Sequence, residues 1–299
     1  MVGASIWVMR TSLKHHLLVW LGLCLLPGVV LGHQDPMGET HPSVVVENGN
    51  FSIYFLSLRR GGNSRDAGRM IFSPSGAVLV PKHLITDPKT QAWMETRNWR
   101  DHGDESVKTS RIGNYESARS AFVLQTGKDG LGPQKPLPFD GPASAWVTSS
   151  WVDQNAIAIL WSQTLVQGEE QEVLMKISWI DRASFSLVAT VDVGKAASIY
   201  DFPSASNLVW AEGKMWVAWV KEFQEEAKDQ KFRWKTVLTS YDPVTKSLQH
   251  KELPQPSNWN TSISMRFLDG WLCLAWHCTK DGSYPGEAAI ITAFEKVRP

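Results

Sequence analysis

The chain has 299 residues, of which 43% are hydrophobic, and its 30 basic residues balance 30 acidic ones, so that the formal net charge is zero. Without a basic excess it lacks the long-range attraction that binding to a nucleic acid or an anionic membrane surface uses, and we expect neither as a partner. Its length and apolar content are sufficient for a sizeable buried core.

The N-terminal residues 1–32 have the pattern of a secretory signal peptide. Arg10 and Lys14 precede an apolar run that is interrupted by Pro27, and Gly32 lies at a cleavage site with small residues. The apolar run is too short for a comfortable membrane span, and no later segment has the length and hydrophobicity of one. We therefore expect a protein that is exported, secreted or periplasmic, without stable membrane insertion.

A short hairpin pattern recurs through the rest of the chain at a nearly constant spacing. Its clearest copy is Leu208–Lys221, where two apolar segments rich in β-branched and aromatic residues flank a Glu-Gly-Lys turn. Copies carry an aromatic near their end at Tyr54, Trp161, Trp219 and Trp276, and the last three of these lie about 57 residues apart. The gap after Tyr54 is about twice as long, so we expect a degenerate copy within it. Because each tryptophan ends a central strand, we expect all three to pack between neighbouring sheets.

A second hairpin follows each of the first ones, and prolines occupy the second position of its turns in Ser-Pro-Ser-Gly and Asp-Pro-Val-Thr. Two hairpins per repeat form a four-stranded antiparallel sheet that cannot bury its faces alone, so the copies must stack. The sequence therefore predicts an all-β fold, a β-propeller with five blades of four-stranded antiparallel sheets. A sixth blade within the weakly patterned segment 81–142, or a β-sandwich, is the alternative.

In chain order, the polar segment 33–43 carries two prolines and predicts a leader without a strand, and residues 44–299 predict a single propeller domain. The first blade is expected within 43–80, and the segment 81–142 has to hold the degenerate second blade. The last blade ends after its third strand, and the leader is a poor source of a strand to complete it. The third, fourth and fifth blades are expected at 143–193, 208–253 and 263–297.

Two cysteines remain after residue 32. Cys273 and Cys278 lie on opposite faces of a continuous strand and too far apart for a disulfide, which needs Cα atoms within about 7 Å. We expect Cys273 to be a small buried side chain unless the chain turns after Trp276. His277 is adjacent to Cys278, but no third residue is spaced to complete a metal site, so the sequence predicts no metal and no cofactor.

The repeat also predicts that the loops within blades and the crossings between blades share one end of the propeller. Four arginines of the glycine-rich loop 59–69 suit a carboxylate, sulfate or phosphate, and carboxylates flank a histidine in 100–105. The crossings add aromatic and hydrogen-bonding residues of the kind that a sugar-binding face uses. For each segment, a solvated surface loop is the alternative. The predicted binding residues are Arg59, Arg60, Arg65, Arg69, Asp101, His102, Asp104, Tyr200, Asp201 and Trp259.

The repeat resembles the BNR/sialidase-like β-propellers. The likeness is carried by PSASNLVWAEGKMWVAWVKE (203–222) and SISMRFLDGWLCLAWH (262–277), and it covers about residues 144–299. The resemblance implies a propeller that binds or cleaves sialic acids and related glycans, and many members of the family are non-catalytic. The segment 64–71 matches the Asp-box signature of the family only in part, so the resemblance assigns no catalytic residue.

Two functions are compatible with these patterns. The first is an exported, non-catalytic propeller that binds a glycan or a partner protein on its loop face. The alternative is a sialidase-like or other propeller glycoside hydrolase or lyase that acts on an acidic glycan, which requires two carboxylates about 5–10 Å apart. The sequence does not decide whether the protein is an enzyme. If it binds a small molecule, we expect an acidic glycan held by the arginine loop, with Tyr200, Asp201 and Trp259 around it.

Overall fold

In the computed structural model, all 18 described elements are β-strands. They belong to Pro36–Pro299, the second of two compact units into which the chain divides. No helix among the described residues is long and apolar enough to cross a membrane. The predicted signal peptide lies outside the described residues and stays a prediction. The structure describes residues 38–58, 65–89, 105–112, 119–126, 132–167, 170–196, 206–223, 233–254, 260–279 and 288–297.

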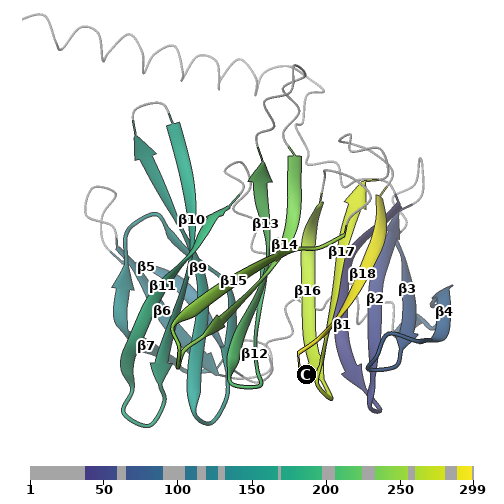
Figure 1. Cartoon of the computed structure of the whole chain (residues 1–299), viewed down its shortest axis with the longest axis horizontal. Helices are drawn as coiled ribbons and strands as arrows, with labels where there is room; N and C mark the ends of the chain where they lie inside the picture. Colours follow the sequence, from purple (N-terminus) through teal and green to yellow (C-terminus); the bar gives the residue numbers. More distant parts are fainter. Residues whose placement is uncertain are drawn as a thin grey trace, which may run out of the picture. The chain divides into compact units, whose positions relative to one another are not determined.

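The strands pair into mainly antiparallel sheets, which form the five blades of a β-propeller (Figure 1). Blade 1 consists of β1 (Gly38–Glu47), β2 (Asn50–Leu58), β3 (Arg65–Phe72) and β4 (Val78–Leu84). Blade 2 consists of β5 (Glu105–Ile112), β6 (Arg119–Thr126) and β7 (Gln134–Gly141). Blade 3 consists of β8 (Ala145–Val152), β9 (Ala156–Gln167), β10 (Glu170–Asp181) and β11 (Ser186–Ala196). Blade 4 consists of β12 (Ser206–Ala211), β13 (Lys214–Phe223), β14 (Arg233–Asp242) and β15 (Ser247–Glu252), and blade 5 of β16 (Asn260–Leu268), β17 (Trp271–Thr279) and β18 (Ala288–Lys296).

This arrangement confirms the predicted all-β propeller with five blades. Blades 1, 3 and 4 have the expected four strands, whereas blades 2 and 5 have three strands each among the described residues. Blade 5 ends after its third strand, as the sequence predicted. Gly38 of β1 pairs in parallel with Ala288 of β18, so that blades 1 and 5 join into a single seven-stranded sheet.

Strand β1 begins within the segment 33–43, for which the sequence predicted no strand. The pairing of β1 with β2 shifts register between Thr40 and Ser43. Pro42 therefore lies in a β-bulge, where the missing N–H of a proline interrupts no ladder hydrogen bond. The sequence predicted no strand here because prolines are rare in strands, but the bulge accommodates Pro42.

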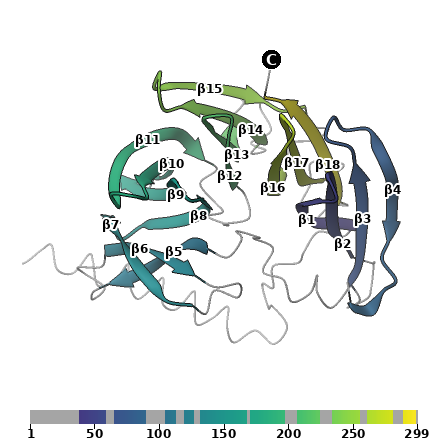
Figure 2. The same ribbon diagram turned by 90° about the horizontal axis from the view of Figure 1, so that it is seen from below.

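The first strands of blades 1, 3, 4 and 5 lie innermost, and they contact one another in the order β1, β16, β12 and β8 (Figure 2). Serine hydroxyls connect them. Ser264 Oγ accepts a hydrogen bond of 2.9 Å from the Val44 N–H, and Ser149 Oγ accepts one of 3.1 Å from the Leu208 N–H. These bonds satisfy backbone groups at the inner edges of the sheets, where no further strand pairs with them.

Blade 2 departs from this plan because its innermost described strand, β5, runs antiparallel to β8. The Val107 N–H donates to Ser150 Oγ at 3.0 Å, and the Val147 N–H donates to Thr109 Oγ1 at 2.8 Å. Strands β5, β6 and β7 thus have the directions of the second to fourth strands in the other blades. This difference, together with the polar sequence of β5, accounts for the degenerate repeat in the segment 81–142.

Three of the first hairpins share the same turn geometry. The backbone angle φ is positive at both residues of Asn48–Gly49, Glu212–Gly213 and Asp269–Gly270. Type I′ turns require this conformation, and their twist matches that of the flanking strands. The aromatic residues at the same distance after these turns are Phe55, Trp219 and Trp276. Phe55 is therefore the equivalent of the tryptophans in blade 1, and the alignment on Tyr54 was wrong by one residue.

The hydrophobic core consists of apolar layers between neighbouring blades, and the repeat tryptophans lie within these layers. Trp161, Trp219 and Trp276 are 6%, 2% and 0% exposed. Trp161 packs between blades 2 and 3, Trp219 between blades 3 and 4, and Trp276 between blades 4 and 5. Their predicted structural role is confirmed. The indole N–H groups of Trp161 and Trp219 donate to Ser178 Oγ at 2.9 Å and Thr239 Oγ1 at 2.8 Å.

Strand β17 shows why these strands read as continuous apolar runs. Cys273 and Ala275 face blade 1, whereas Trp276 and Cys278 face blade 4, so both faces of the strand are buried. Cys273 and Cys278 are buried on opposite faces and form no disulfide with each other. Burial raises the pKa of the Cys273 thiol, which keeps this side chain protonated and apolar in character.

Candidate functional site

Arg69 is the only sequence-predicted binding residue whose side chain is described. Arg65 opens β3, and only its backbone is described. The remaining predicted residues lie outside the described part of the chain: Arg59, Arg60, Asp101, His102, Asp104, Tyr200, Asp201 and Trp259.

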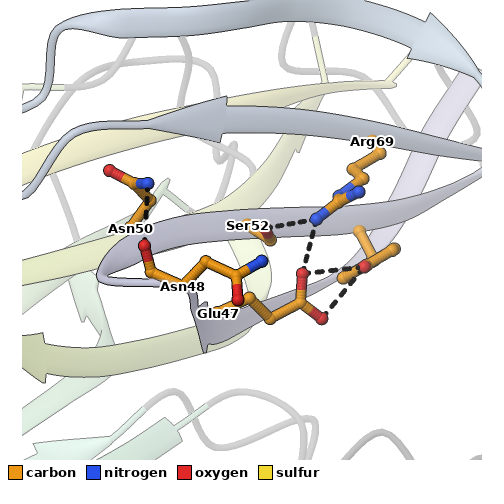
Figure 3. A network of polar contacts seen from close by, with 6 residues as sticks. Glu47, Asn48, Asn50, Ser52 and Arg69 are labelled. Atoms are coloured by element: carbon orange, nitrogen blue, oxygen red, sulfur yellow. Dashed lines mark hydrogen bonds and ion pairs between the residues drawn. The ribbon is translucent and has the colours of Figure 1, made fainter.

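The guanidinium group of Arg69 is held inside blade 1 (Figure 3). Its Nη2 atom lies 2.5 Å from Glu47 Oε2 and donates a hydrogen bond of 2.9 Å to Ser52 Oγ. The Tyr54 hydroxyl donates to the same carboxylate at 3.0 Å, and Arg69 Cζ lies 5.1 Å from the centre of the Tyr54 ring. Glu47 ends β1 at the β1–β2 turn, so the guanidinium extends away from the end of the blade where the segment 59–64 joins β2 to β3.

Replacing Arg69 by alanine should lower the free energy of unfolding by about 1–2 kcal/mol, because Glu47 and Ser52 lose a charged hydrogen-bond donor. Urea denaturation measures this change. In a double-mutant cycle, Glu47→Gln and Arg69→Ala should be clearly non-additive, whereas Lys89→Ala, at an exposed position, should have almost no effect. Additive effects would show that the ion pair contributes nothing to stability.

A different group of residues lies at the end of the blades where the chain enters the inner strands β8, β12 and β16, which we call the loop end. Among the tryptophans whose side chains are described, Trp146 is the only exposed one, at 40%. It is the second residue of β8 and pairs with Ser162 of β9. Because Ser162 is on the same face of β9 as Leu160, Trp146 lies on the side of blade 3 that faces blade 4.

Two buried hydroxyl groups without a hydrogen-bond partner lie near Trp146. They are Ser162 Oγ of blade 3 and Ser206 Oγ at the start of β12 in blade 4. Asn207 Oδ1 also has no partner, but Asn207 alternates with Leu208 along β12 and therefore faces blade 5. Ser206 lies close to the start of β8 because the bond from Leu208 N–H to Ser149 Oγ fixes β12 alongside β8. Buried polar groups are usually paired, so this concentration indicates a place suited to polar groups of a ligand.

A histidine pair lies at the same end, between blades 5 and 1. His277 of β17 is 4% exposed, its Nδ1 atom has no hydrogen-bond partner, and its ring centre is 6.4 Å from that of His41. Burial, and secondly the charge of His41, lower the pKa of His277 to about 3, so this imidazole is neutral near pH 7. His41 and Ser262 have φ of 52° and 54° at the bulges of β1 and β16.

Trp146, Ser162, Ser206 and His277 are uncharged, although neighbouring strands at this end also carry Glu172, Lys195 and Lys221. Strands β8, β12 and β16 contain no aspartate or glutamate. Within the described residues, no three histidine, cysteine, aspartate or glutamate side chains are grouped to hold a metal ion. Neutral imidazole, hydroxyl and amide groups donate and accept hydrogen bonds, which suits a ligand that carries hydroxyl groups.

Sequence reasoning missed Trp146 because it considered only the tryptophans at repeat-equivalent positions and assigned those to the core. The available signal was position. Trp146 is the second residue of an inner strand, shortly after the proline- and glycine-rich segment 127–142, in which the structure has strand β7 where the sequence predicted a loop, whereas Trp161, Trp219 and Trp276 lie within central strands.

Comparisons with known proteins return only distant structural similarity. No protein-family model matches the sequence, and no curated protein matches it significantly. A GH32 beta-fructofuranosidase of Bombyx mori is 14% identical, with a TM-score of 0.39, and the match covers 86% of this chain but only 60% of that enzyme. A GH43_1 enzyme of Xanthomonas citri is 12% identical, with a TM-score of 0.38 and coverage of 86% and 87% of the two chains. The GH43 endo-arabinanase of Bacillus licheniformis is 12% identical, with a TM-score of 0.35 and coverage of 87% and 96%. Such values establish no family, activity or substrate for this chain.

Proposed function

We propose that this protein is an exported, non-catalytic β-propeller that binds a glycan at the loop end of its inner strands. The observation that carries the proposal is the exposure of Trp146, at 40%, among described tryptophans that are otherwise buried or half-buried. An exposed indole ring on an inner strand loses the packing that the buried tryptophans have between blades. A ligand that packs against the ring would replace this packing. The apolar face of a sugar ring is a suitable partner for it.

The polar groups around Trp146 support a glycan as the ligand. Ser162 and Ser206 carry buried oxygen atoms without partners at the same end of blades 3 and 4. A sugar has hydroxyl groups that both donate and accept hydrogen bonds at its edge and C–H groups on its face. An aromatic ring with a few convergent polar groups is the composition expected of a small-molecule site.

The same groups favour an uncharged glycan. Trp146 and the nearby Ser162 and Ser206 are neutral, and so is His277 near pH 7. The acidic glycan expected from the arginine loop has less support, because Arg69 is paired with Glu47 and is directed toward the opposite end of blade 1.

Binding without catalysis is supported by the composition of the inner strands. Hydrolysis of a glycosidic bond uses two carboxylates on either side of the bond. Strands β8, β12 and β16 supply hydroxyl and amide groups and no carboxylate, whereas the inner strands β1 and β5 contain Glu39, Glu47 and Glu105. The candidate acids Asp101, Asp104 and Asp201 lie outside the described residues, so a hydrolase or lyase is the alternative that the experiment must also test.

Trp146→Ala should weaken binding to immobilised neutral oligosaccharides by about tenfold to a hundredfold, because the stacking surface is removed. Trp146→Phe should retain most of the affinity. Val244→Ser, at an 87% exposed position in the turn between the outer strands β14 and β15, should bind like the wild type. Calorimetry on a panel of neutral and acidic glycans provides the measurement.

Equal binding by wild type and Trp146→Ala would remove Trp146 from the site and overturn the proposal. Release of reducing sugar from the same glycans by the wild-type protein would establish the hydrolase alternative instead. A preference for acidic glycans that Arg59→Ala/Arg60→Ala abolishes would return the site to the arginine loop.

A further inference from the structure

We propose that the face of the β9–β10 hairpin beyond Trp146 binds a second sugar unit, so that the ligand is an oligosaccharide lying along Trp146 and Val166. This inference rests on the proposed glycan binding at Trp146, and it adds the size of the ligand and the direction in which it extends.

Among the described residues, strands β9 and β10 are longer than their equivalents in blades 4 and 5. Strands β9 and β10 have 12 residues each, whereas β13 has 10 and β17 has 9. After Trp161, β9 continues to Gln167, and the ladder with β10 is unbroken up to the pair of Gln167 with Glu170. Figure 1 shows this hairpin projecting beyond the rest of blade 3.

The projecting part continues the surface on which Trp146 lies. Trp146 pairs with Ser162, and because side chains alternate along a strand, Thr164 and Val166 follow on the same face. Val166 is 65% exposed, which is unusual for a large apolar side chain on a paired strand. Ser144 Oγ donates to the Thr164 carbonyl at 2.8 Å, which ties the start of β8 to the hairpin.

This strip is long enough for more than one sugar ring and carries no charge. At about 3.3 Å per residue, Ser162 and Val166 are about 13 Å apart along the strand. Glu172, which pairs with Leu165 and therefore lies on the opposite face, forms an ion pair with Lys195. Trp146, Thr164 and Val166 thus form a neutral strip with an apolar group at each end and the Thr164 hydroxyl between them, whereas Ser162 is buried.

The test measures affinity as a function of ligand length with oligosaccharides of one to four neutral hexose or pentose units. Wild-type affinity should rise from one unit to two or three. Val166→Ser should weaken binding of the longer ligands by about threefold to tenfold and leave single-unit binding unchanged, since it removes an apolar contact that only the second unit makes. Val188→Ser, at a 54% exposed position on the outer strand β11, is the matched control and should have no effect.

Trp146→Ala separates this inference from the proposed function. If this variant loses binding while ligand length and Val166→Ser have no effect, the second subsite does not exist and glycan binding at Trp146 still stands. If no ligand binds in a manner that depends on Trp146, both proposals are overturned. An equal loss with Val166→Ser at every ligand length would also contradict the subsite, because it would indicate a general effect on the hairpin.

Discussion

Trp219→Ala is expected to lower the free energy of unfolding by about 3–5 kcal/mol, which is the cost typical of removing a buried tryptophan. Trp219 is 2% exposed and packs in the layer between blades 3 and 4, and its indole N–H donates to Thr239. The ring also lies against Gly194 of β11, where a Cβ atom would come within 3.0 Å of the indole. The surrounding side chains belong to two sheets held by their own ladders, so the cavity cannot easily collapse.

Urea or thermal denaturation followed by far-ultraviolet circular dichroism, with each variant referred to its own folded and unfolded baselines, measures this change. Trp146→Ala is the matched control, because it removes the same side chain from an exposed position and should cost less than about 1 kcal/mol. If the two variants were equally destabilised, Trp219 would not have the interblade packing role assigned to it.

Acidification is expected to destabilise the protein through His277. The pKa of a histidine in an unfolded chain is about 6.5, and burial lowers the pKa of His277 in the folded protein to about 3. Below pH 6.5 the unfolded chain therefore binds a proton that the folded protein does not. The free energy of unfolding therefore has its full value above pH 6.5 and falls progressively as the pH falls from 6.5 toward 3.

The expected loss is about 1.4 kcal/mol per pH unit within this window, or about 2 kcal/mol between pH 6.5 and pH 5. Carboxylates and other histidines, among them His41 across the interface and His250, also titrate, so the readout is the difference between the wild type and His277→Gln. This variant removes the titrating group and should show a shallower decline of stability with acidification. His83→Gln, at an exposed position on β4, should keep the wild-type slope. Equal slopes for wild type and His277→Gln would show that His277 is not held neutral by burial.

The architecture could be predicted from the sequence because its determinants are local. Type I′ turns at Glu212–Gly213 and Asp269–Gly270 need residues that tolerate positive φ, and the Gly of each pair marks its hairpin in the sequence. The strands that follow are apolar at every position, since alternate residues face two different blades. The spacing of Trp161, Trp219 and Trp276 then gives the blade count, because each repeat is one sheet.

The failures in the fold came from pairings between distant parts of the chain. The segment 33–43 has too many proline and polar residues for an ordinary strand. Its second half is nevertheless a strand, because a bulge accommodates Pro42 and because Gly38 pairs with Ala288, which is distant in the sequence. The reversed direction of β5 relative to β8 is likewise invisible in the local pattern. Strand direction depends on which neighbour a segment meets.

The candidate site depended on tertiary structure even more strongly. The sequence placed Arg69 in an arginine-rich loop, but its side chain extends toward Glu47. The Glu47 carboxylate and the Ser52 hydroxyl on the neighbouring strands accept its hydrogen bonds there. Trp146 and Trp219 are the same residue type in similar apolar segments. Trp146 is exposed because it lies at the loop end of an inner strand. Trp219 is buried because it lies in the layer between two blades. Propensity and periodicity act over a few residues and therefore determined the hairpins and their repetition; burial and partner choice act across blades, and only the assembled structure decided them.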